Sequence, residues 1–501
     1  MGDPGGIPAL KTLNDMIQNN RGKIFNRITM NTPQGFSPLY TDMYQLTMGQ
    51  AYFLNRRHDM KACFDYFFRK MPFEGGYVVF AGLGNLLKMI EELQFDASDI
   101  DYLHEKGFHP DYLDYLKGFR FNGNITGMVE GEIVFSVEPM LRVEGGLLEV
   151  QLVETLLLNM LNFQSLIATK ANRIRHSAGN RTLSDFGLRR AQGMGGIQAS
   201  RAAIIGGFDT TSNVFAARQN DIPPAGTMAH SFIESYDDEL KAFRAYAGIF
   251  PDNCVLLVDT YSTLRSGLPN AIKVGKELVQ QGKKLTGIRL DSGDLAYLSK
   301  RAREMLDQEG MDYVKIIVSN QLDEHVVKSL LEQKAPVDIF GVGTSMVIGR
   351  PDGAIDGVYK LSSSDGKPRL KISENLQKTT LPGRKKVLRY FDDRGAFYAD
   401  CIALVDESDP QKMTHPYQKE KSLSLEGRKF EDLFIRHMAE GRNTSPAENP
   451  FELREKVRHR LEQLPEEHKR FDFPHIYRVG ISDKLLQLRD TMVQKLQDYI
   501  K

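Results

Sequence analysis

The chain has 501 residues, a length that favours two or more structural units over one. Apolar residues make up 41% of it and charged residues 26%, which is the composition of a soluble globular protein. Basic and acidic residues both total 65, and this zero net charge argues against general binding to nucleic acid or to a membrane surface.

The three cysteines, Cys63, Cys254 and Cys401, are far apart and none belongs to a CxxC pair. This pattern indicates neither a disulfide framework nor a structural zinc site, and it favours a reducing, cytoplasmic setting. The N-terminus lacks the apolar core of a signal peptide, and no apolar stretch approaches the roughly 18 residues of a membrane span. We interpret residues 1–36 as a loosely ordered extension.

Residues 37–150 mix helical and strand patterns. A capped helix is expected over 37–55, a strand over 61–70, a strand, tight turn and helix over 75–93, and short strands over 124–146. We interpret this region as an N-terminal α/β sandwich domain with a small sheet.

The segment GLGNLL (82–87) resembles the start of a dinucleotide-binding fingerprint. The third glycine is missing, and no acidic residue clearly follows on a second strand at the required distance. A dinucleotide-dependent oxidoreductase is therefore a weak alternative.

A long apolar helix is expected over residues 147–179, with basic residues near its end and a glycine after it. Strand-like segments then recur, most of them followed by a helical stretch. This rhythm predicts a parallel, irregular (β/α) barrel of about seven units within residues 151–350. The expected strands are TLSDFG (182–187), FDTTSN (208–213), GTMAHSF (226–232), CVLLVDT (254–260), TGIRLDSGD (286–294), VKIIVSN (314–320) and VDIFGVGT (337–344).

The carboxyl ends of barrel strands are where barrel enzymes carry their chemistry. The residues expected there are Asp185, Asp209, His230, Asp259, Arg289, Asp291, Asn320 and Gly343. Arg289 stands between Ile288 and Leu290, and a charge in an apolar strand is costly unless an anion or carboxylate meets it. Taken alone, His230 is interpreted as a packed, hydrogen-bonded side chain. A functional role for it needs support from the other residues at the strand ends.

Three strand ends suit an anionic ligand, although each has a structural alternative. In FGVGTS (340–345), backbone N–H groups and hydroxyls can hold a phosphate, or the segment is an ordinary turn. In IRLDSGD, Asp291 and Asp294 suit ribose hydroxyls or Mg²⁺, or serve to cap the next helix. In DFGLRRAQG (185–193), two arginines match a carboxylate or phosphate, or form a solvated surface pair.

After residue 350 the chain is turn-rich and basic. We expect residues 351–445 to return to the first unit and complete the sandwich domain. Residues 446–501 are expected to form a C-terminal helical region, in which the sequence carries no chemical signature.

One ordered set of segments is specific enough to suggest a family. PLYTDMYQLTM, ETLLLNMLNFQSLIATK, DFGLRRAQG, GGFDTTSN, GTMAHSF, GIRLDSGD, FGVGTS and LPGRKKVLRY together resemble nicotinate phosphoribosyltransferase. The resemblance implies an irregular β/α barrel joined to an α/β sandwich, working as a homodimer with shared active sites. It also implies the conversion of nicotinate, phosphoribosyl pyrophosphate and ATP to nicotinate mononucleotide, pyrophosphate, ADP and phosphate, with Mg²⁺ as cofactor, for NAD biosynthesis.

The resemblance assigns site residues. His230 would be the histidine that ATP phosphorylates, and Arg289 and Asp291 would be catalytic, with Asp291 also holding the ribose and the metal-bound pyrophosphate. The expected substrate-binding residues are Tyr44 and Asp42 from the partner subunit, Phe186 stacking on the pyridine ring, Arg189, Asp209, Thr227 beside the histidine, Asp294, and Gly343 and Thr344 in the 5′-phosphate loop.

Other functions remain as alternatives. Nicotinamide phosphoribosyltransferase shares the histidine, the DSGD segment and the glycine loop, but paired arginines suit a carboxylate better than a neutral amide. Quinolinate phosphoribosyltransferase shares the barrel without the phosphohistidine motif. A non-catalytic nucleotide-binding or regulatory protein is disfavoured because His230, Arg289 and Asp291 occur together.

Overall fold

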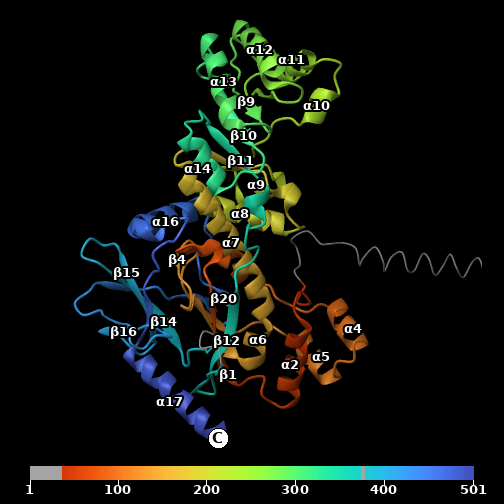
Figure 1. Ribbon diagram of the computed structural model, residues 1–501. Coiled ribbons are helices and arrows are strands. Elements are labelled where there is room, and N and C mark those ends of the chain that lie inside the picture. Colours follow the sequence, from red (N-terminus) through yellow and green to blue (C-terminus); the bar gives the residue numbers. More distant parts are fainter. Residues whose placement is uncertain (1–36, 374–378, 501) are drawn as a thin grey trace, which may run out of the picture.

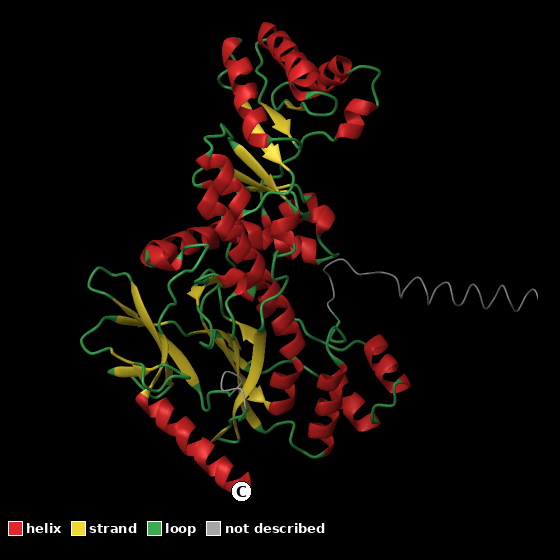
Figure 2. Ribbon diagram, in the orientation of Figure 1, coloured by secondary structure: helices red, strands yellow, loops and turns green. Residues whose placement is uncertain are grey.

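The computed structural model describes residues 37–373 and 379–500 (Figure 1), so the extension predicted over residues 1–36 lies outside the described part. Two sheets and their helices form the lower part in Figure 2, and a third sheet with its helices forms the upper part. The residue boundaries proposed above for the domains stay predictions.

The first sheet is antiparallel and combines distant parts of the chain. Its central strand, Lys61–Phe68, is buried along nearly its whole length, as its many aromatic residues require. It pairs on one side with a strand from before the barrel and on the other with a strand from after it. In spatial order the strands are β13 (Lys367–Pro368), β12 (Gly357–Ser364), β1 (Lys61–Phe68), β5 (Leu141–Gly146), β3 (Asn124–Gly127), β19 (Ile435–Ala439) and β20 (Arg442–Asn443).

The second sheet is built from the later part of the chain. Its central strand β15 pairs antiparallel with β14 and parallel with β21. In spatial order the strands are β17 (Ser422–Ser424), β16 (Lys412–Thr414), β21 (Val479–Ser482), β15 (Phe397–Leu404), β14 (Lys385–Phe391) and β18 (Phe430–Asp432). A short ladder joins β2 (Val78–Val79) to β4 (Ile133–Val134).

The helices that accompany these sheets begin and end as follows: α2 (Met43–Leu54), α3 (Leu83–Glu91), α4 (Ala97–Glu105), α5 (Pro110–Lys117), α6 (Leu147–Leu152), α7 (Glu154–Ala178), α16 (Pro450–Gln463) and α17 (Asp483–Ile500). The helix expected over residues 147–179 is therefore two helices, α6 and α7, that meet at Val153.

Helix α7 connects the two parts of the molecule (Figure 1). It is apolar on more than one side: Leu166 packs in the lower core, while Ile167 and Ala171 pack in the barrel core. The stretch Leu147–Ala178 reaches the length and hydropathy of a membrane span, against the expectation that no stretch would, but 72% of that window is buried inside the protein. It is therefore the core helix of this fold.

The third sheet confirms the parallel β/α architecture. Within the described residues it has six strands, all parallel, in the order β7 (Thr210–Thr211), β6 (Thr182–Asp185), β11 (Ile339–Val342), β10 (Lys315–Ser319), β9 (Gly287–Leu290) and β8 (Val255–Leu257). Strands β7 and β8 stand at its two edges, so the barrel is irregular. The helices are α8 (Gly195–Gly206), α9 (Val214–Asn220), α10 (His230–Glu234), α11 (Glu239–Ile249), α12 (Leu268–Gln280), α13 (Leu295–Gln308), α14 (Glu324–Glu332) and α15 (Thr344–Val347).

Two expectations about the strands were wrong. Residues 226–232 form a loop and the start of α10, with only an isolated bridge between Thr211 and Pro224. The pairing with β7 ends at Ala225, whose N–H donates to the Thr211 carbonyl, before the segment expected as a strand. Asp209 precedes the two-residue strand β7, so it lies at the amino end of that strand and not at its carboxyl end.

The glycines of GLGNLL serve packing. A Cβ on Gly82 would lie 2.9 Å from the carbonyl oxygen of Met160 in α7. The N–H groups of Gly82 and Gly84 donate to the buried carboxylate of Glu130, at 2.6 and 2.9 Å. Glu130 is in turn paired with Arg201. These N–H groups are not open to a pyrophosphate, which removes the physical basis of the dinucleotide alternative.

Candidate active site

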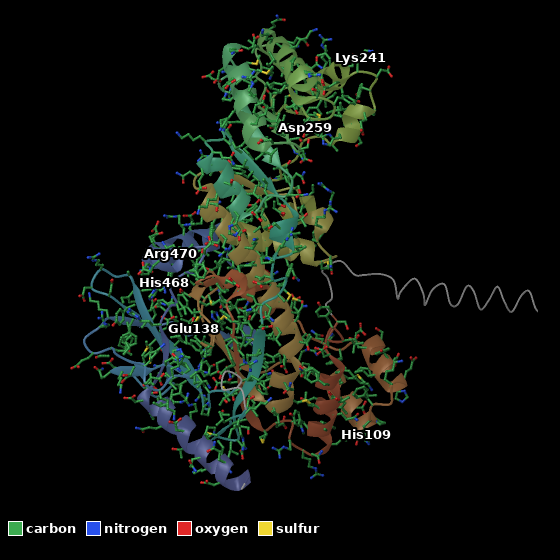
Figure 3. All side chains as sticks on the ribbon, viewed as in Figure 1. His109, Glu138, Lys241, Asp259, His468 and Arg470 are labelled. Carbon is green, nitrogen blue, oxygen red and sulfur yellow. The ribbon has the colours of Figure 1, made fainter. Side chains whose placement is uncertain are left out.

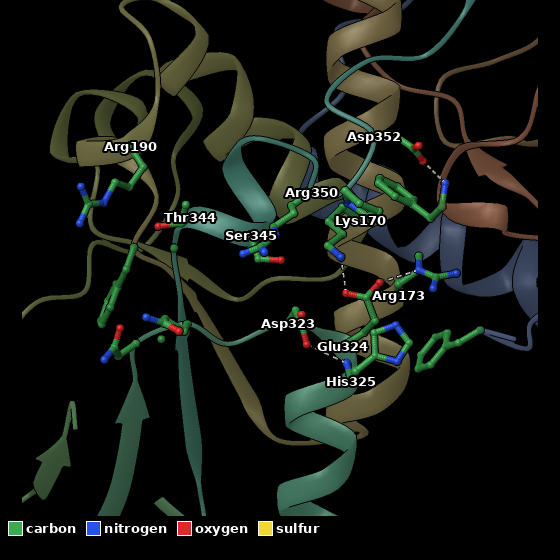
Figure 4. A pocket seen from close by; sticks show the side chains of 18 of the residues that line it. Lys170, Arg173, Arg190, Asp323, Glu324, His325, Thr344, Ser345, Arg350 and Asp352 are labelled. Carbon is green, nitrogen blue, oxygen red and sulfur yellow. Dashed lines mark hydrogen bonds and ion pairs between the residues drawn. The ribbon is translucent and has the colours of Figure 1, made fainter. Parts of the chain in front are cut away.

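A cavity of about 1100 Å³ opens at the carboxyl ends of β6, β9, β10 and β11 (Figure 4). Its lining residues include Asn320, which was expected at a strand end, and six residues that were assigned to the site: Phe186, Arg189, Arg289, Asp291, Gly343 and Thr344. They come from three loops up to 158 positions apart, and the parallel sheet brings them to one edge because carboxyl ends of parallel strands share an edge.

Arg289 is held by contacts on three sides. Its Nε donates to Ser319 Oγ at 2.9 Å, and its Nη2 donates to Asp291 Oδ1 at 2.8 Å. Its guanidinium carbon lies 5.3 Å from the centroid of the Phe186 ring. The side chain is 14% exposed, so its charge is largely withdrawn from water but still reaches the cavity. The requirement for a carboxylate partner, inferred from the apolar strand, is met by Asp291.

Phe186 lies on a turn that a buried carboxylate fixes. Asp185 accepts hydrogen bonds from the Gly187 N–H, Ser200 Oγ and Thr211 Oγ1, at 2.8, 2.7 and 2.7 Å. Burial raises the pKa of Asp185, and these three donors oppose the rise. The ring of Phe186 packs directly on the backbone of Gly341 in β11, where a Cβ would lie 2.4 Å from Cε2. An aromatic face is thus fixed beside Arg289.

Two adjacent residues, Asp259 and Thr260, contact Asp291 on one side and His230 on the other. The backbone N–H of Asp291 and the hydroxyl of Ser292 donate to Asp259 Oδ2, at 2.8 and 2.7 Å. The next residue, Thr260, places its Oγ1 3.0 Å from His230 Nδ1. His230 does not line the cavity itself; it is the first residue of α10. Figure 3 labels Asp259 in the upper part of the molecule.

The segment after β11 offers backbone and hydroxyl groups. Gly343 has extended φ and unusual ψ, −116° and −99°, and α15 begins at Thr344. Thr344 is exposed in the cavity, and the buried Ser345 Oγ has no hydrogen-bond partner in the structure. A hydroxyl left without a partner at a cavity wall is suited to a polar ligand.

Two further arginines at the cavity, Arg189 and Arg190, are exposed. Within residues 37–373 and 379–500, neither is paired with a carboxylate. Their charge is therefore available to an anionic ligand.

A cluster that the sequence did not assign to the site forms another wall. Glu324 lies between Lys170 and Arg173 of α7 (Figure 4); it pairs with Lys170 Nζ and accepts from Arg173 Nε at 2.8 Å. The ring of Phe73 lies against Lys170 and Arg173, and the ring of Phe471 against Arg173. Burial lowers the pKa of Lys170, opposed by Glu324. The only sequence signal was a group of basic residues late in an apolar helix, which also marks an ordinary helix end.

The other predicted site residues lie outside this cavity. Asp209 faces a separate cavity of about 610 Å³ and pairs with Arg175 and Arg454, at 2.6 and 3.1 Å. Asp294 caps α13 by accepting from the Tyr297 N–H at 3.0 Å. Thr227 lies in the loop before α10.

Asp42 and Tyr44 belong to the start of α2, in the lower part of the molecule. Asp42 Oδ2 accepts from Thr155 Oγ1 at 2.9 Å. Tyr44 is 46% exposed. Partial burial, and then the charge of Glu154, raise the pKa of its phenol to about 12, so Tyr44 stays protonated at neutral pH. Neither residue lines the cavity of its own chain.

In the part of the chain that the structure describes, no group of three or more His, Cys, Asp or Glu side chains could hold a metal ion. Asp259 and Asp291 are nonetheless hydrogen-bonded neighbours, and Asp259 Oδ1 is buried without a partner. Such a pair fits Mg²⁺ that is bound mainly through a substrate, because Mg²⁺ commonly takes one or two carboxylates plus phosphate oxygens.

Comparison with known proteins shows what this chain is similar to. Family models match for the nicotinate phosphoribosyltransferase N-terminal domain over residues 39–162, the nicotinate phosphoribosyltransferase family over 181–414 and its C-terminal domain over 384–489. Nicotinate phosphoribosyltransferase of Bacillus subtilis is 44% identical over 89% of this chain and 93% of its own length.

Two further relatives agree. The nicotinate phosphoribosyltransferase of Caenorhabditis elegans is 36% identical over 91% of this chain and 93% of its own. The crystal structure of human nicotinic acid phosphoribosyltransferase superposes with a TM-score of 0.81 at 31% identity, covering 90% of this chain and 99% of the human chain. The same barrel and sandwich thus recur in a solved relative, and the chain belongs to the nicotinate phosphoribosyltransferase family.

Proposed function

We propose that this protein transfers the phosphoribosyl group of phosphoribosyl pyrophosphate to nicotinate, forming nicotinate mononucleotide for NAD biosynthesis. The observation that carries the proposal is the meeting of Phe186, Arg289, Asp291 and the Gly343–Thr344 segment in one cavity. An aromatic face, fixed cations and a phosphate-binding segment are what an anionic pyridine and a phosphorylated sugar need.

The chemistry requires little proton transfer. The ring nitrogen of nicotinate already carries a lone pair, and the sugar carbon that it attacks gains oxocarbenium character as pyrophosphate leaves. Catalysis is then mainly positioning and charge stabilisation. In this proposal Phe186 stacks on the pyridine, Arg289 and Arg189 meet the anionic groups, Asp291 binds the ribose hydroxyls, and Gly343 with Thr344 binds the 5′-phosphate.

Mg²⁺ would enter with the pyrophosphate and would neutralise part of its charge. Asp291 and Asp259 are the carboxylates placed to hold it, supported by the unpartnered Oδ1 of Asp259. The capping bond of Asp294 and the ion pairs of Asp209 favour structural roles for these two residues.

We further propose that ATP phosphorylates His230 and that this step drives the transfer forward. A modification shifts an equilibrium only by interacting differently with the two states. Thr260 contacts the histidine, and the adjacent Asp259 accepts from the Asp291 N–H, so the end of β8 supplies a connection between the histidine and the sugar site. Thr227 lies on the same loop as His230. The variant His230→Ala should lose ATP hydrolysis coupled to product formation while keeping slow, ATP-independent transfer.

The proposed assembly is a homodimer in which Tyr44 and Asp42 reach the partner's site. Two sets of exposed apolar side chains support it. Met43 and Tyr44 are exposed on α2, and Leu188, Met194, Val214 and Phe215 are exposed around the start of α8 and α9. These side chains would be buried if the two elements met the partner subunit. Buried free cysteines suit a cytoplasmic location.

One assay tests the function. The purified chain is given phosphoribosyl pyrophosphate, Mg²⁺ and ATP with nicotinate, nicotinamide or quinolinate, and the mononucleotide is measured. Nicotinate should be used by far the best of the three. Equal or faster use of nicotinamide would select the alternative enzyme, and mononucleotide formation that is indifferent to ATP would reject the coupling while keeping the transfer.

A further inference from the structure

The guanidinium of Arg289 has an edge, formed by Nε and Nη2, that matches the two oxygens of a single carboxylate. In this structure two side chains share that edge. Nε donates to Ser319 Oγ at 2.9 Å, and Nη2 donates to Asp291 Oδ1 at 2.8 Å. The hydroxyl of Ser319 in turn donates to the same Asp291 Oδ1. One oxygen of Asp291 therefore receives two donors, and the guanidinium does not close on both oxygens of the carboxylate.

Two polar atoms of this arrangement are left open. Within residues 37–373 and 379–500, Asp291 Oδ2 and Arg289 Nη1 have no hydrogen-bond partner. Both residues line the cavity, and the Asp291 side chain is 30% exposed. The arrangement thus leaves the cavity one carboxylate oxygen, which can accept from a hydroxyl, and one N–H group, which can bind an anion.

Ser319 is held in place by the sheet. It is the last residue of β10 and is buried. Strand β10 pairs in parallel with β9 on one side and with β11 on the other, where Ser319 lies opposite Gly341. The backbone of Asp291 is held as well, because its N–H donates to Asp259 Oδ2 at 2.8 Å. With both backbones held, the carboxylate of Asp291 can turn only about its own side-chain bonds, and the Ser319 hydroxyl sets how it turns.

We propose that Ser319 is a positioning residue that stops Arg289 from closing on both oxygens of Asp291 and so leaves Asp291 Oδ2 for the phosphoribosyl ligand. The inference deepens the proposed function and rests on it. Without the hydroxyl, the Nε–H group of Arg289 would lose its acceptor, and an unsatisfied donor in a largely desolvated place is costly. The open acceptor in this cluster is Asp291 Oδ2, and the two-bond arginine–carboxylate pair is a favoured geometry. Such a pair would satisfy Arg289 and occupy the oxygen that the ligand needs.

A crystal structure of the full-length Ser319→Ala variant tests the geometry directly. We expect Nε and Nη2 of Arg289 to bond to the two oxygens of Asp291, one to each. An Asp291 carboxylate that keeps its wild-type orientation, with Oδ2 unpaired, would overturn the inference. This measurement reports the positions of the side chains and does not depend on catalysis.

Ligand binding tests the consequence. Calorimetry measures the Kd of phosphoribosyl pyrophosphate in the presence of Mg²⁺, without nicotinate or ATP. Ser319→Ala should raise this Kd about ten- to hundredfold, the effect of losing one hydrogen bond to a charged group. The control is Ser299→Ala, which removes a buried serine hydroxyl of the same barrel that donates to the Ala296 carbonyl, and it should bind as the wild type does. A Ser319→Ala enzyme with the wild-type melting temperature and Kd would contradict the proposal.

A second background separates positioning from general damage to the fold. Arg289→Lys removes the forked group, and an ammonium cannot bond to both oxygens of Asp291 in the same geometry. In that background Ser319→Ala should raise the Kd by less than about threefold, because the two changes act through one contact. Equal rises in the two backgrounds would mean that Ser319 does not act through Arg289, and would contradict the proposal.

Failure of this inference and failure of the proposed function have different signatures. If the wild type forms nicotinate mononucleotide while Ser319→Ala keeps the wild-type geometry and Kd, the inference about Ser319 has failed. If the wild type neither binds phosphoribosyl pyrophosphate nor forms the mononucleotide, while the Arg289–Asp291 pair closes in Ser319→Ala, the proposed function has failed.

Discussion

Arg289 and Phe186 are 103 residues apart in the chain but line the same cavity, where the guanidinium carbon of Arg289 lies 5.3 Å from the centroid of the Phe186 ring. The cation gains from the ring's negative face and from Asp291 together. Strand pairing makes the meeting possible: β9 reaches β6 through β10 and β11, so two loops distant in sequence end on one edge. The site therefore depends on the order of strands in the sheet as much as on the residues.

Replacement of Arg289 should remove transition-state stabilisation. A charge of this kind, paired and mostly desolvated, costs about 2–5 kcal/mol when truncated. We expect the kcat/KM of Arg289→Ala for nicotinate to fall by the factor that corresponds to this free energy. Arg289→Lys should recover little of that kcat/KM, because the ammonium group cannot bond to Ser319 and Asp291 in the forked geometry of a guanidinium. Arg244→Ala, an exposed arginine of the same barrel paired with Glu277, is the control. A folded Arg289→Ala enzyme with near-normal kcat/KM would remove Arg289 from the site.

Gly341 should control the place of the Phe186 ring. An added methyl would lie 2.4 Å from Cε2 of that ring, and forced repacking of this kind costs about 1–3 kcal/mol. Gly341→Ala should raise the KM for nicotinate by about tenfold while changing the KM for phosphoribosyl pyrophosphate much less. Gly248→Ala, where nothing lies within 4 Å of the added atom, should have no effect. Equal changes in both KM values would mean that the ring does not contact the pyridine.

Neutralising Glu324 should destabilise the fold. Burial alone would raise the pKa of this carboxyl, but Lys170 and Arg173 lower it overall, so Glu324 is ionised between two buried cations. Glu324→Gln leaves these cations without their counter-charge, and breaking such a buried pair costs about 3–5 kcal/mol. Urea unfolding measures the loss. Glu332→Gln, on the same helix in a long, exposed pair with Lys328, should change stability by less than about 0.5 kcal/mol.

Glu138 should make stability fall as the pH rises. This side chain is fully buried; burial first, and then the negative charge of Asp400, raise its pKa well above the usual 4.5. Figure 3 labels it in the lower part of the molecule. Between 4.5 and the raised value the folded state keeps a proton that the unfolded state has lost, so the stability present below 4.5 disappears as pH climbs through that window.

Glu138→Gln should flatten this dependence, since the amide cannot titrate. Unfolding free energies at a series of pH values, for the wild type and the variant, give the comparison. Parallel curves for the two proteins above pH 4.5 would show that Glu138 is ionised in the fold.

Site residues could be predicted from the sequence when the polar or aromatic side chain and the strand pattern lie in the same short segment. Arg289 inside an apolar strand, and Phe186 and Gly343 at strand ends, could be placed because their neighbours define the strand. Residues next to a short or interrupted strand could not be placed in this way. The two-residue β7 put Asp209 at the wrong end, and the segment expected as a strand before His230 is a loop.

Side-chain pairs between distant segments could not be predicted from the sequence either. Lys170 and Glu324 are 154 positions apart, and nothing in either segment points to the other. The His230–Thr260 contact likewise depends on how a loop returns to the end of β8. Residues whose partner lies in another strand–helix unit become visible only once the sheet is assembled.

The last prediction concerns the shared site. Tyr44 and Arg289 lie in different parts of one chain, and Tyr44 does not line that chain's cavity. In a two-fold dimer each subunit can offer both surfaces.

Tyr44→Ala and Arg289→Ala homodimers should both be nearly inactive. Unfolding the two variants together and refolding an equal mixture should give about half mixed dimers, each with one doubly defective site and one intact site, and so about a quarter of wild-type activity. If Tyr44 served its own chain, every site would keep one defect. If mixed dimers form, as shown by differential tagging, and activity is no higher than in the parent variants, the shared site is rejected. The control mixture pairs Arg289→Ala with Tyr52→Ala, a change on the same helix, in place of Tyr44→Ala.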